Sequence, residues 1–219
     1  MLRLASRVNL VTKPTKIVLD ALSSCGLLLK QDKLLPNVVT LLTGESLRTS
    51  WWSHPKGRLI FAVLAELADH PDVLFVKLLD GKDALVHRRL WPALLAVVTA
   101  GEPWQLQNLS AASRKLLANL NESKAAVRSS GPAVKEIEMR LLAHAEQVHT
   151  ESGRHEIVLE PWSVWQRRLR VKPLRSPTAS SAALGRQRIE EAVAAIGAPL
   201  SALPWAARRL RPKRNGARD

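Results

Sequence analysis

A helix followed directly by a two-stranded hairpin is predicted twice in this chain of 219 residues. The first copy spans residues 57–89 and the second spans residues 131–162. In each copy, apolar residues recur at helical spacing and then give way to two short apolar segments. A tight polar turn separates these segments, at residues 80–82 in the first copy and 151–154 in the second. The pattern therefore predicts a mainly helical α+β protein that contains two hairpins.

Further helices are expected upstream of each hairpin. The first expected helix lies within residues 16–29 and stops near Gly26. The other expected helices lie at residues 36–44, 58–68, 92–100, 110–120, 132–142 and 186–196, and the expected strands at 73–79, 84–88, 124–128, 147–150 and 155–159. Helices followed by a two-stranded wing are the order of the winged-helix variant of the helix-turn-helix module. We therefore expect an N-terminal arm (1–15), two winged-helix-like modules (16–101 and 102–168) and a basic C-terminal extension (169–219) with one helix and a disordered tail.

Positive charge is concentrated near the C-terminus. The formal net charge is +14, and residues 161–219 hold 13 Lys and Arg against three acids. Such a balance favours binding to nucleic acid, most simply double-stranded DNA, because Lys and Arg displace condensed counterions from phosphates. A solvated tail that only aids solubility is the alternative.

Other broad classes of protein have less support. Cys25 is the single cysteine, which leaves no disulfide framework and is typical of a small buried side chain. No apolar run is long enough to span a bilayer, and the basic N-terminus has no clear signal-peptide core, although a transit peptide stays open. We expect a cytoplasmic, nucleoid-associated protein without a cofactor and without membrane contact, for which a protein partner is possible.

Tryptophans next to basic residues are the best candidates for nucleic-acid contact. They occur in residues 45–56 and 87–91, and such a mixture is typical of surfaces that stack bases and hold phosphates. The alternative is that Trp52 and Trp91 pack helices onto the wing. Of the adjacent pair, we expect Trp51 to be exposed and Trp52 to be buried. The predicted contact residues are Arg48, Trp51, His54, Lys56, Lys82, His87, Arg88, Arg89, Arg154, Arg167, Arg168 and Arg170.

Chemistry is less clearly indicated. Glu45 precedes the tryptophan pair, where a carboxylate could orient a water beside a stacked base, although capping a loop is the alternative. His149 and His155, together with Glu151, resemble a metal half-site, but no third ligand has the expected spacing, and cross-strand pairing of polar residues is the better explanation. The motifs of nucleotide hydrolysis, dinucleotide redox chemistry and zinc proteolysis do not occur in the sequence.

The stretches TGESLRTSWWSHPKGRLIF, LVHRRLWPALLAV and RLLAHAEQVHTESGRHEIVLEPW resemble an uncharacterised family of bacterial proteins across about residues 16–168. That resemblance implies no activity. More distantly, the chain is similar to the tandem winged-helix DNA glycosylases that unhook interstrand crosslinks. Their Gln-x-Gln catalytic motif is matched by Gln105-Leu106-Gln107, so the resemblance implies catalytic roles for Gln105 and Gln107.

The leading interpretation is a DNA-binding tandem winged-helix protein that acts on duplex or damaged DNA. A glycosylase-like repair enzyme is the first alternative, and a winged-helix module that binds another protein is the second. A first module surrounded by basic groups would favour DNA, whereas a wide uncovered apolar face would favour a protein partner.

Overall fold

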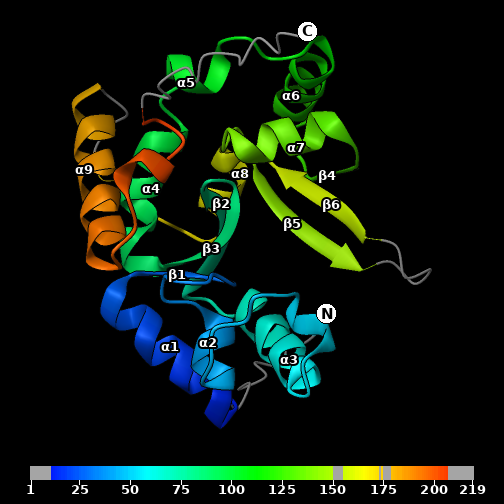
Figure 1. The fold of residues 1–219 in the computed structure, drawn as a ribbon. Coiled ribbons are helices and arrows are strands. Elements are labelled where there is room, and N and C mark those ends of the chain that lie inside the picture. The colour runs from blue at the N-terminus through cyan, green and yellow to red at the C-terminus, as the bar shows by residue number, and fades with distance from the viewer. Residues whose placement is uncertain (1–10, 150–154, 173, 175–178, 207–219) are drawn as a thin grey trace, which may run out of the picture.

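The computed structural model describes residues 11–149, 155–172, 174 and 179–206. These residues form a mainly helical α+β fold with two three-stranded antiparallel sheets, which confirms the expected fold class (Figure 1). The α-helices are α1 (Lys13–Cys25), α2 (Val38–Thr43), α3 (Gly57–Ala68), α4 (Trp91–Val98), α5 (Pro103–Leu106), α6 (Ala111–Ser123), α7 (Pro132–Met139), α8 (Trp162–Arg168) and α9 (Ala179–Ala195). The strands are β1 (Leu27–Leu29), β2 (Val73–Leu79), β3 (Lys82–His87), β4 (Val127–Ser129), β5 (His144–His149) and β6 (His155–Glu160), and three 3₁₀ turns are η1 (Trp51–Ser53), η2 (Arg88–Leu90) and η3 (Leu200–Ala202).

The first sheet has the strand order β1-β3-β2, and in the chain β1 lies between α1 and α2 whereas β2 and β3 follow α3. The expected end of the first helix near Gly26 is confirmed, because the chain leaves the helix at Gly26 (φ 82°), but the strand that follows it was not expected. Glycine adopts this left-handed conformation without steric cost, so α1 ends there. The leucines of 27–29 then pair with β3 as strand β1. Helical periodicity could not reveal this switch, since three consecutive leucines suit either structure.

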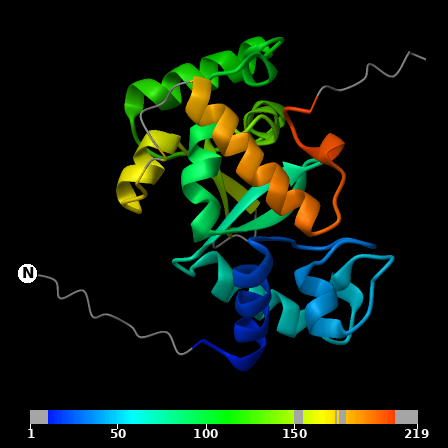
Figure 2. The same ribbon diagram turned by 90° about the vertical axis from the view of Figure 1, so that its left-hand side faces the viewer.

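This sheet is buried on both faces. Alternate residues such as Leu28 and Leu85 pack with α1, α2 and α3, whereas Leu27 and Val86 pack with α4, α8 and α9. Figure 2 shows the two groups of helices on opposite sides of the sheet. A strand that is covered on both faces needs apolar residues at nearly every position, which explains why Lys77 is the one polar residue of β2.

The second sheet repeats the same strand arrangement. Its order is β4-β6-β5, with β4 between α6 and α7 in the chain and with β5 and β6 after α7. The sheet packs on a smaller core around Leu120, Ile137 and Leu159. Helices α1 and α6 each have 13 residues, and strands β1 and β4 each have three. A counterpart of α2 is missing from this part of the described chain, because β4 and α7 are separated by two residues.

A cluster of tryptophans joins the two halves. Each half places a tryptophan at the start of the helix after its hairpin, Trp91 in α4 and Trp162 in α8. Their indole N–H groups donate to Val86 O (3.0 Å) and Leu141 O (2.8 Å). Trp165 contacts Trp91 edge-on with the ring centroids 5.1 Å apart. The interpretation of Trp91 as a packing residue is therefore confirmed.

Helix α9 belongs to the first core, which corrects the expected C-terminal extension. The helix begins earlier than the expected residue 186, and its Ile189 and Val193 are completely buried. It lies along α4, where a Cβ at Gly185 would come within 2.5 Å of the Ala93 carbonyl oxygen (Figure 1). Residues 179–206 are therefore an integral part of the fold. The expected disordered tail, 207–219, lies outside the described residues.

Candidate nucleic-acid interface

The adjacent tryptophans occupy opposite environments, but in the reverse of the expected order. Trp51 is 6% exposed and packs in the core of α1–α3, whereas Trp52 is 61% exposed. The expectation assumed an extended loop, but the two residues begin the 3₁₀ turn η1 after Ser50. Helix α3 then starts directly against this turn, because Gly57 lacks a Cβ that would lie 3.1 Å from Trp52 O. The packing of α3 therefore decides which ring is buried.

Trp52 and Phe61 form what we call the aromatic platform. The Trp52 ring stacks on Trp51 with centroids 3.9 Å apart and 25° between the planes. Phe61, on the next turn of α3, lies 5.8 Å from Trp52 and is 43% exposed. A buried ring therefore supports an exposed ring from below, so the platform is held in position before any ligand binds.

Basic residues flank the platform in the sequence, although two of the predicted ones have structural roles. Lys56 Nζ donates to Leu42 O (2.9 Å) and so caps α2, and His54 Nε2 lies 3.0 Å from Glu45 Oε1. Arg48 is exposed in the preceding loop. Arg58, in the first turn of α3, is exposed as well and was missed by the sequence prediction. The signal available in the sequence was the position of Arg58 in the first turn of the expected helix, directly after Gly57 and two residues before Ile60.

Most predicted basic contacts of the first wing have intramolecular partners. Arg88 Nη1 lies 3.6 Å from Asp72 Oδ1, and its guanidinium carbon lies 5.8 Å from the Trp91 ring centroid. Arg89 Nη2 donates to Ser24 O (2.8 Å). His87 Nδ1 accepts from the backbone N–H of Arg89 (3.3 Å), and burial lowers the pKa of His87. These groups hold the wing to its own module.

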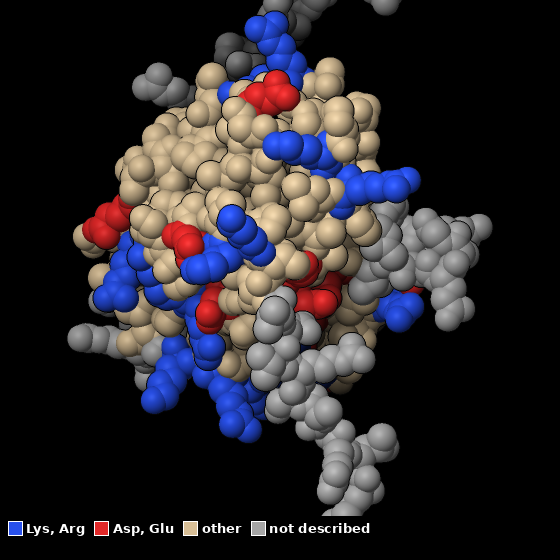
Figure 3. Space-filling view, turned by 90° about the horizontal axis from the view of Figure 1, so that it is seen from below, with Lys and Arg blue, Asp and Glu red and all other residues tan. Residues whose placement is uncertain are grey.

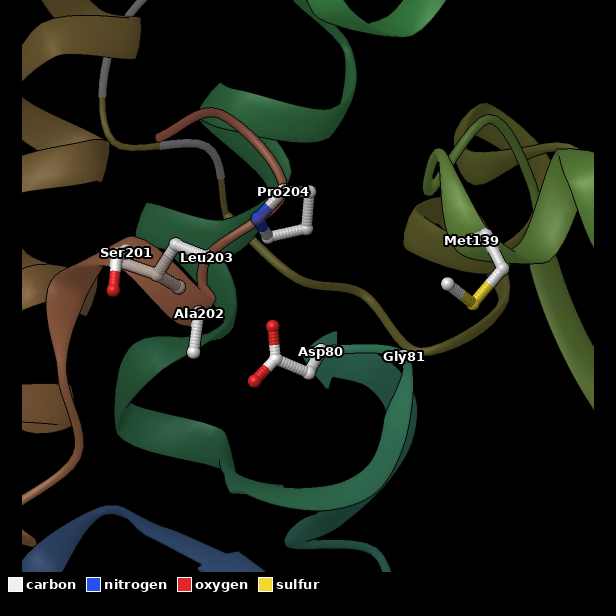
Figure 4. A pocket seen from close by; sticks show the side chains of 7 residues that line it. All are labelled: Asp80, Gly81, Met139, Ser201, Ala202, Leu203 and Pro204. Atoms are coloured by element: carbon white, nitrogen blue, oxygen red, sulfur yellow. The ribbon is translucent and has the colours of Figure 1, made fainter. Parts of the chain in front are cut away.

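One side of the first hairpin's turn packs against α7 and the C-terminal region, although Asp80 and Lys82 are exposed. Asp80 N donates to Ala202 O (2.8 Å), and Gly81 lies against the Met139 side chain (Figure 4). A cavity of only about 40 Å³ remains between them. Lys82 Nζ contacts Asp32 Oδ2 (2.6 Å). This wing therefore serves packing between the halves, whereas the contact at Lys82 stays a prediction, because its side chain is half-exposed as well as paired with Asp32.

The remaining predicted contacts lie in the second half of the chain. Arg168 Nη2 contacts Glu160 Oε2 (2.7 Å), whereas Arg167 and Arg170 are exposed at the end of α8. Arg154 lies outside the described residues. So do the side chains of His149 and His155, together with Glu151, and the described residues contain no group of three metal-ligating side chains.

The residues with predicted catalytic roles are not brought together. Gln105 is completely buried in α5, where Oε1 accepts from Glu102 N (3.1 Å) and Nε2 donates to Val98 O (2.9 Å). Both halves of its amide are occupied, so Gln105 is a structural residue that cannot touch a substrate. Gln107 is exposed, and its backbone oxygen accepts from Arg140 Nη1 (2.6 Å). Glu45 lies in another region, beside the platform, paired with His54.

A groove of about 830 Å³ runs between the halves, and we call it the inter-module groove. Helix α3 and strand β2 line one side, and α8 and the second sheet line the other. The aromatic platform lies at its α3 wall. The charged residues that line it are of mixed sign: Lys30, Lys77 and Arg168 with Asp69, Asp83, Glu138 and Glu146.

Burial perturbs several ionisable groups of this groove. It lowers the pKa of His144 to about 4, because charging the ring among Trp162 and Trp165 costs hydration. It raises the pKa of Glu138. Burial would also raise the pKa of Asp83, but Lys30 and Lys77 contact its carboxylate and together hold that pKa below its ordinary value.

The surface of the first half is not uniformly basic. Figure 3 shows the underside of the molecule, where Lys and Arg side chains are interspersed with Asp and Glu and separated by broad neutral areas. Residues 207–219, outside the described part, hold six of the 33 Lys and Arg against one acid. None of the described helices is long and apolar enough to cross a membrane.

Comparison with protein-family models, with curated proteins and with solved structures gave no match to the chain. The functional assignment therefore depends on the geometry of the platform and the groove.

Proposed function

We propose that the protein binds DNA as a tandem winged-helix protein and that Trp52 is the centre of the contact. The observation that carries the proposal is the 61% exposure of Trp52, a large ring that stacks on buried Trp51 beside the N-terminus of α3. A ring that is exposed to this extent contributes little to the free energy of unfolding. It is suited to stacking on a base, which contributes about 1–3 kcal/mol.

The order of the elements supports the winged-helix interpretation. Residues 13–87 run α1-β1-α2-α3-β2-β3 with the strand order β1-β3-β2, as in a winged helix. In that module the helix that occupies the position of α3 can enter the major groove. The second half repeats this order without the middle helix. Nucleoid association would follow from DNA binding by such a module.

The chemistry of the platform favours distorted or damaged duplexes. A base within an intact duplex is already stacked on both sides, so it gains little from Trp52, whereas an unpaired base gains a new partner. Arg48 and Arg58 are exposed on either side of the platform in the sequence and would contact flanking phosphates. The basic residues 207–219 would add affinity without sequence preference.

The test compares Trp52→Ala with Leu34→Ala, a matched control at another exposed apolar side chain (93% exposed). Binding to intact duplex, abasic duplex and single-stranded DNA is measured by fluorescence anisotropy at two salt concentrations. We expect Trp52→Ala to weaken binding to abasic duplex by about 5- to 150-fold, the equivalent of one lost stacking contact, with an unchanged melting temperature. Leu34→Ala should bind as wild type. Equal affinities of wild type and Trp52→Ala would remove the platform from the contact.

Protein recognition is a second candidate, because the outward face of α3 is poor in charge. Phe61, Ala62, Ala65 and Ala68 are exposed along one side of the helix. A DNA-reading helix normally presents polar side chains there. If the wild-type protein binds none of the three DNAs at low salt, this candidate replaces the first.

The glycosylase-like alternative is tested with the same samples. Gln105 is excluded by its burial, so Glu45 and Gln107 remain as the candidate catalytic groups. Release of a base from alkylated, deaminated or crosslinked DNA would support it, provided that Glu45→Ala or Gln107→Ala abolishes the product while keeping DNA affinity. If the wild-type protein releases no base, the glycosylase-like alternative is discarded and the DNA-binding proposal remains.

A further inference from the structure

We propose that the inter-module groove binds a linear polyamine, a flexible chain in which ammonium groups are separated by methylene segments. The proposal does not depend on DNA binding, because it uses none of the residues of the aromatic platform. It rests on the helix ends that meet at the groove, on the carboxylates that line it and on the spacing between those carboxylates.

Two helices end at this groove. Helix α3 ends at Ala68 and α7 ends at Met139, and the acids at these ends, Asp69 and Glu138, line the groove. The C-terminal end of a helix carries a partial negative charge, which Lys or Arg in the last turn normally offsets. Neither helix has a basic residue in its last turn, and Arg140, which follows α7, donates to backbone oxygens in and beside α5 instead. The two helix ends therefore add negative potential to the groove.

The basic groups of the groove are already paired, whereas several of its acids are not. Lys30 and Lys77 both contact Asp83, and Arg168 Nη2 lies 2.7 Å from Glu160 Oε2. Three carboxylates that line the groove have no ion pair within the described chain, those of Asp69, Glu138 and Glu146. Burial raises the pKa of Glu138, because the nearby positive charge of Lys77 does not offset the lost hydration. The groove therefore has acidic groups to offer to a cationic ligand.

His144 is a further polar side chain of the groove, and it makes no hydrogen bond within the described residues. Its ring is only 9% exposed, and Nδ1 lies 3.8 Å from Glu160 Oε2, which is too far for a hydrogen bond. Because burial lowers its pKa to about 4, the ring is neutral at pH 7 and one of its nitrogens can accept a hydrogen bond. A polar group that is buried to this extent normally has a partner, and a ligand ammonium would supply it.

The spacing of the acids fits an extended ligand rather than a compact ion. Asp69 joins α3 to the turn before β2, whereas the charge of Glu138 interacts with those of Lys77 and Asp83, a cross-strand pair toward the other end of β2. Residues 73–77 line the groove between these positions and span about 13 Å. The α3 wall along this length is apolar and contributes Leu64, Ala65 and Ala68. Ammonium groups with methylene groups between them match this order of charged and apolar surface.

The formal net charge of +14 does not oppose this site. At physiological ionic strength the Debye length is about 8 Å, so a bound ammonium group interacts with the carboxylates of the groove far more strongly than with distant Lys and Arg side chains. The same carboxylates repel phosphates. DNA that contacts Trp52 would therefore keep its backbone outside the groove, and the two ligands would occupy different surfaces.

The test is isothermal titration calorimetry of the full chain with spermidine, without DNA and at about 0.15 M salt. Glu138→Gln and Asp69→Asn are compared with Glu122→Gln, a matched change at an exposed acid of α6 that does not line the groove. We expect saturable binding to the wild-type protein, weakened by about fivefold or more in each groove variant and unchanged in Glu122→Gln. Circular dichroism checks that all three variants fold, and Asp69, an exposed residue, provides a test even if Glu138→Gln does not fold.

Two further ligands test the extended shape and the chemical class. Ethylenediamine, whose two ammonium groups are too close together to reach both ends of the groove, should bind at least about tenfold more weakly than spermidine. The proposal is overturned if spermidine does not bind saturably, or if the groove variants bind it as tightly as Glu122→Gln does. Tighter binding of tri-lysine than of spermidine would also overturn it, by identifying a basic protein segment as the ligand. Because no DNA is present, failure here leaves the DNA-binding proposal intact, and failure to bind DNA leaves this one intact.

Discussion

At the scale of single residues, identical neighbours have different roles. Trp51 and Trp52 differ by a single position, yet one is a core residue and the other has most of its surface in water. The difference arises because η1 and the start of α3 turn only one ring inward. The histidines whose side chains the structure describes also differ in environment, and His144 is the clearest case.

His144 predicts a pH dependence of stability. Its folded pKa, about 4, lies below the ordinary value of 6.5, so the unfolded chain binds its proton more readily. Stability is therefore complete above pH 6.5 and falls as the pH decreases toward 4. Between pH 7.5 and 5 we expect a loss of about 2 kcal/mol from this group.

The measurement is urea unfolding of wild type and His144→Gln at both pH values. The difference between the two proteins isolates His144, since burial also lowers the pKa of His87, and Glu160 lies only 3.8 Å from the His144 ring. Equal pH dependence in the two proteins would show that this ring does not titrate as described.

At the scale of elements, the first hairpin shows how a wing becomes a packing element. Both central residues of its turn have positive φ, 49° at Asp80 and 70° at Gly81, as in the type I′ turns that suit the twist of a hairpin. The turn then meets α7 and η3, so its geometry matters to both halves of the molecule.

Gly81→Ala should cost more stability than Gly44→Ala, measured by urea unfolding. Both glycines have positive φ, which costs alanine about 1–2 kcal/mol. Gly44 has open space around it, whereas a Cβ at Gly81 would overlap Met139. We expect an additional loss of up to about 1 kcal/mol at Gly81, because the atoms that the Cβ meets are the terminal Cε and Sδ of Met139, a flexible side chain that can shift.

The overlap with Met139 can be separated from the backbone strain. In a Met139→Ala background, the additional loss at Gly81 should disappear and only the strain should remain. An additional loss that persists in this background would mean that another contact of the turn is responsible.

At the scale of the whole molecule, the C-terminal region closes the fold. Helix α9 covers α4, and Arg186 Nη1 contacts the carboxylate of Glu102 (2.5 Å to Oε2). Trp205 Nε1 donates to Glu190 Oε1 (2.8 Å) and its ring lies 5.8 Å from that of Trp104. The described chain is therefore organised as two halves around a shared tryptophan cluster and one closing helix.

Two truncations should therefore behave differently. Removing 207–219 should leave the melting temperature nearly unchanged but flatten the dependence of DNA affinity on salt, because six Lys and Arg are lost. Removing 173–219 should unfold the protein, since it also strips Ile189 and Val193 from the core. Circular dichroism and salt titrations check both. An unchanged salt slope for the shorter truncation would exclude the tail from DNA binding.

The helices and turns that depend on residues close together in the chain could be predicted from the sequence. Helical spacing predicted α3 and α7, the Asp-Gly turn predicted the first hairpin, and proline and glycine marked several helix ends correctly. It also predicted the packing role of Trp91. These features depend on residues that are close in the chain, so a pattern within a short window contains the needed information.

Tertiary structure decided the features that depend on distant partners. Leu27–Leu29 became a strand because β3 pairs with it, and the polar Gln105 was enclosed because Val98 and Glu102 satisfy its amide. Trp52 rather than Trp51 was exposed because α3 packs against η1 on one side only. Burial and pairing are properties of surfaces that meet in space, and residues far apart in sequence create those surfaces.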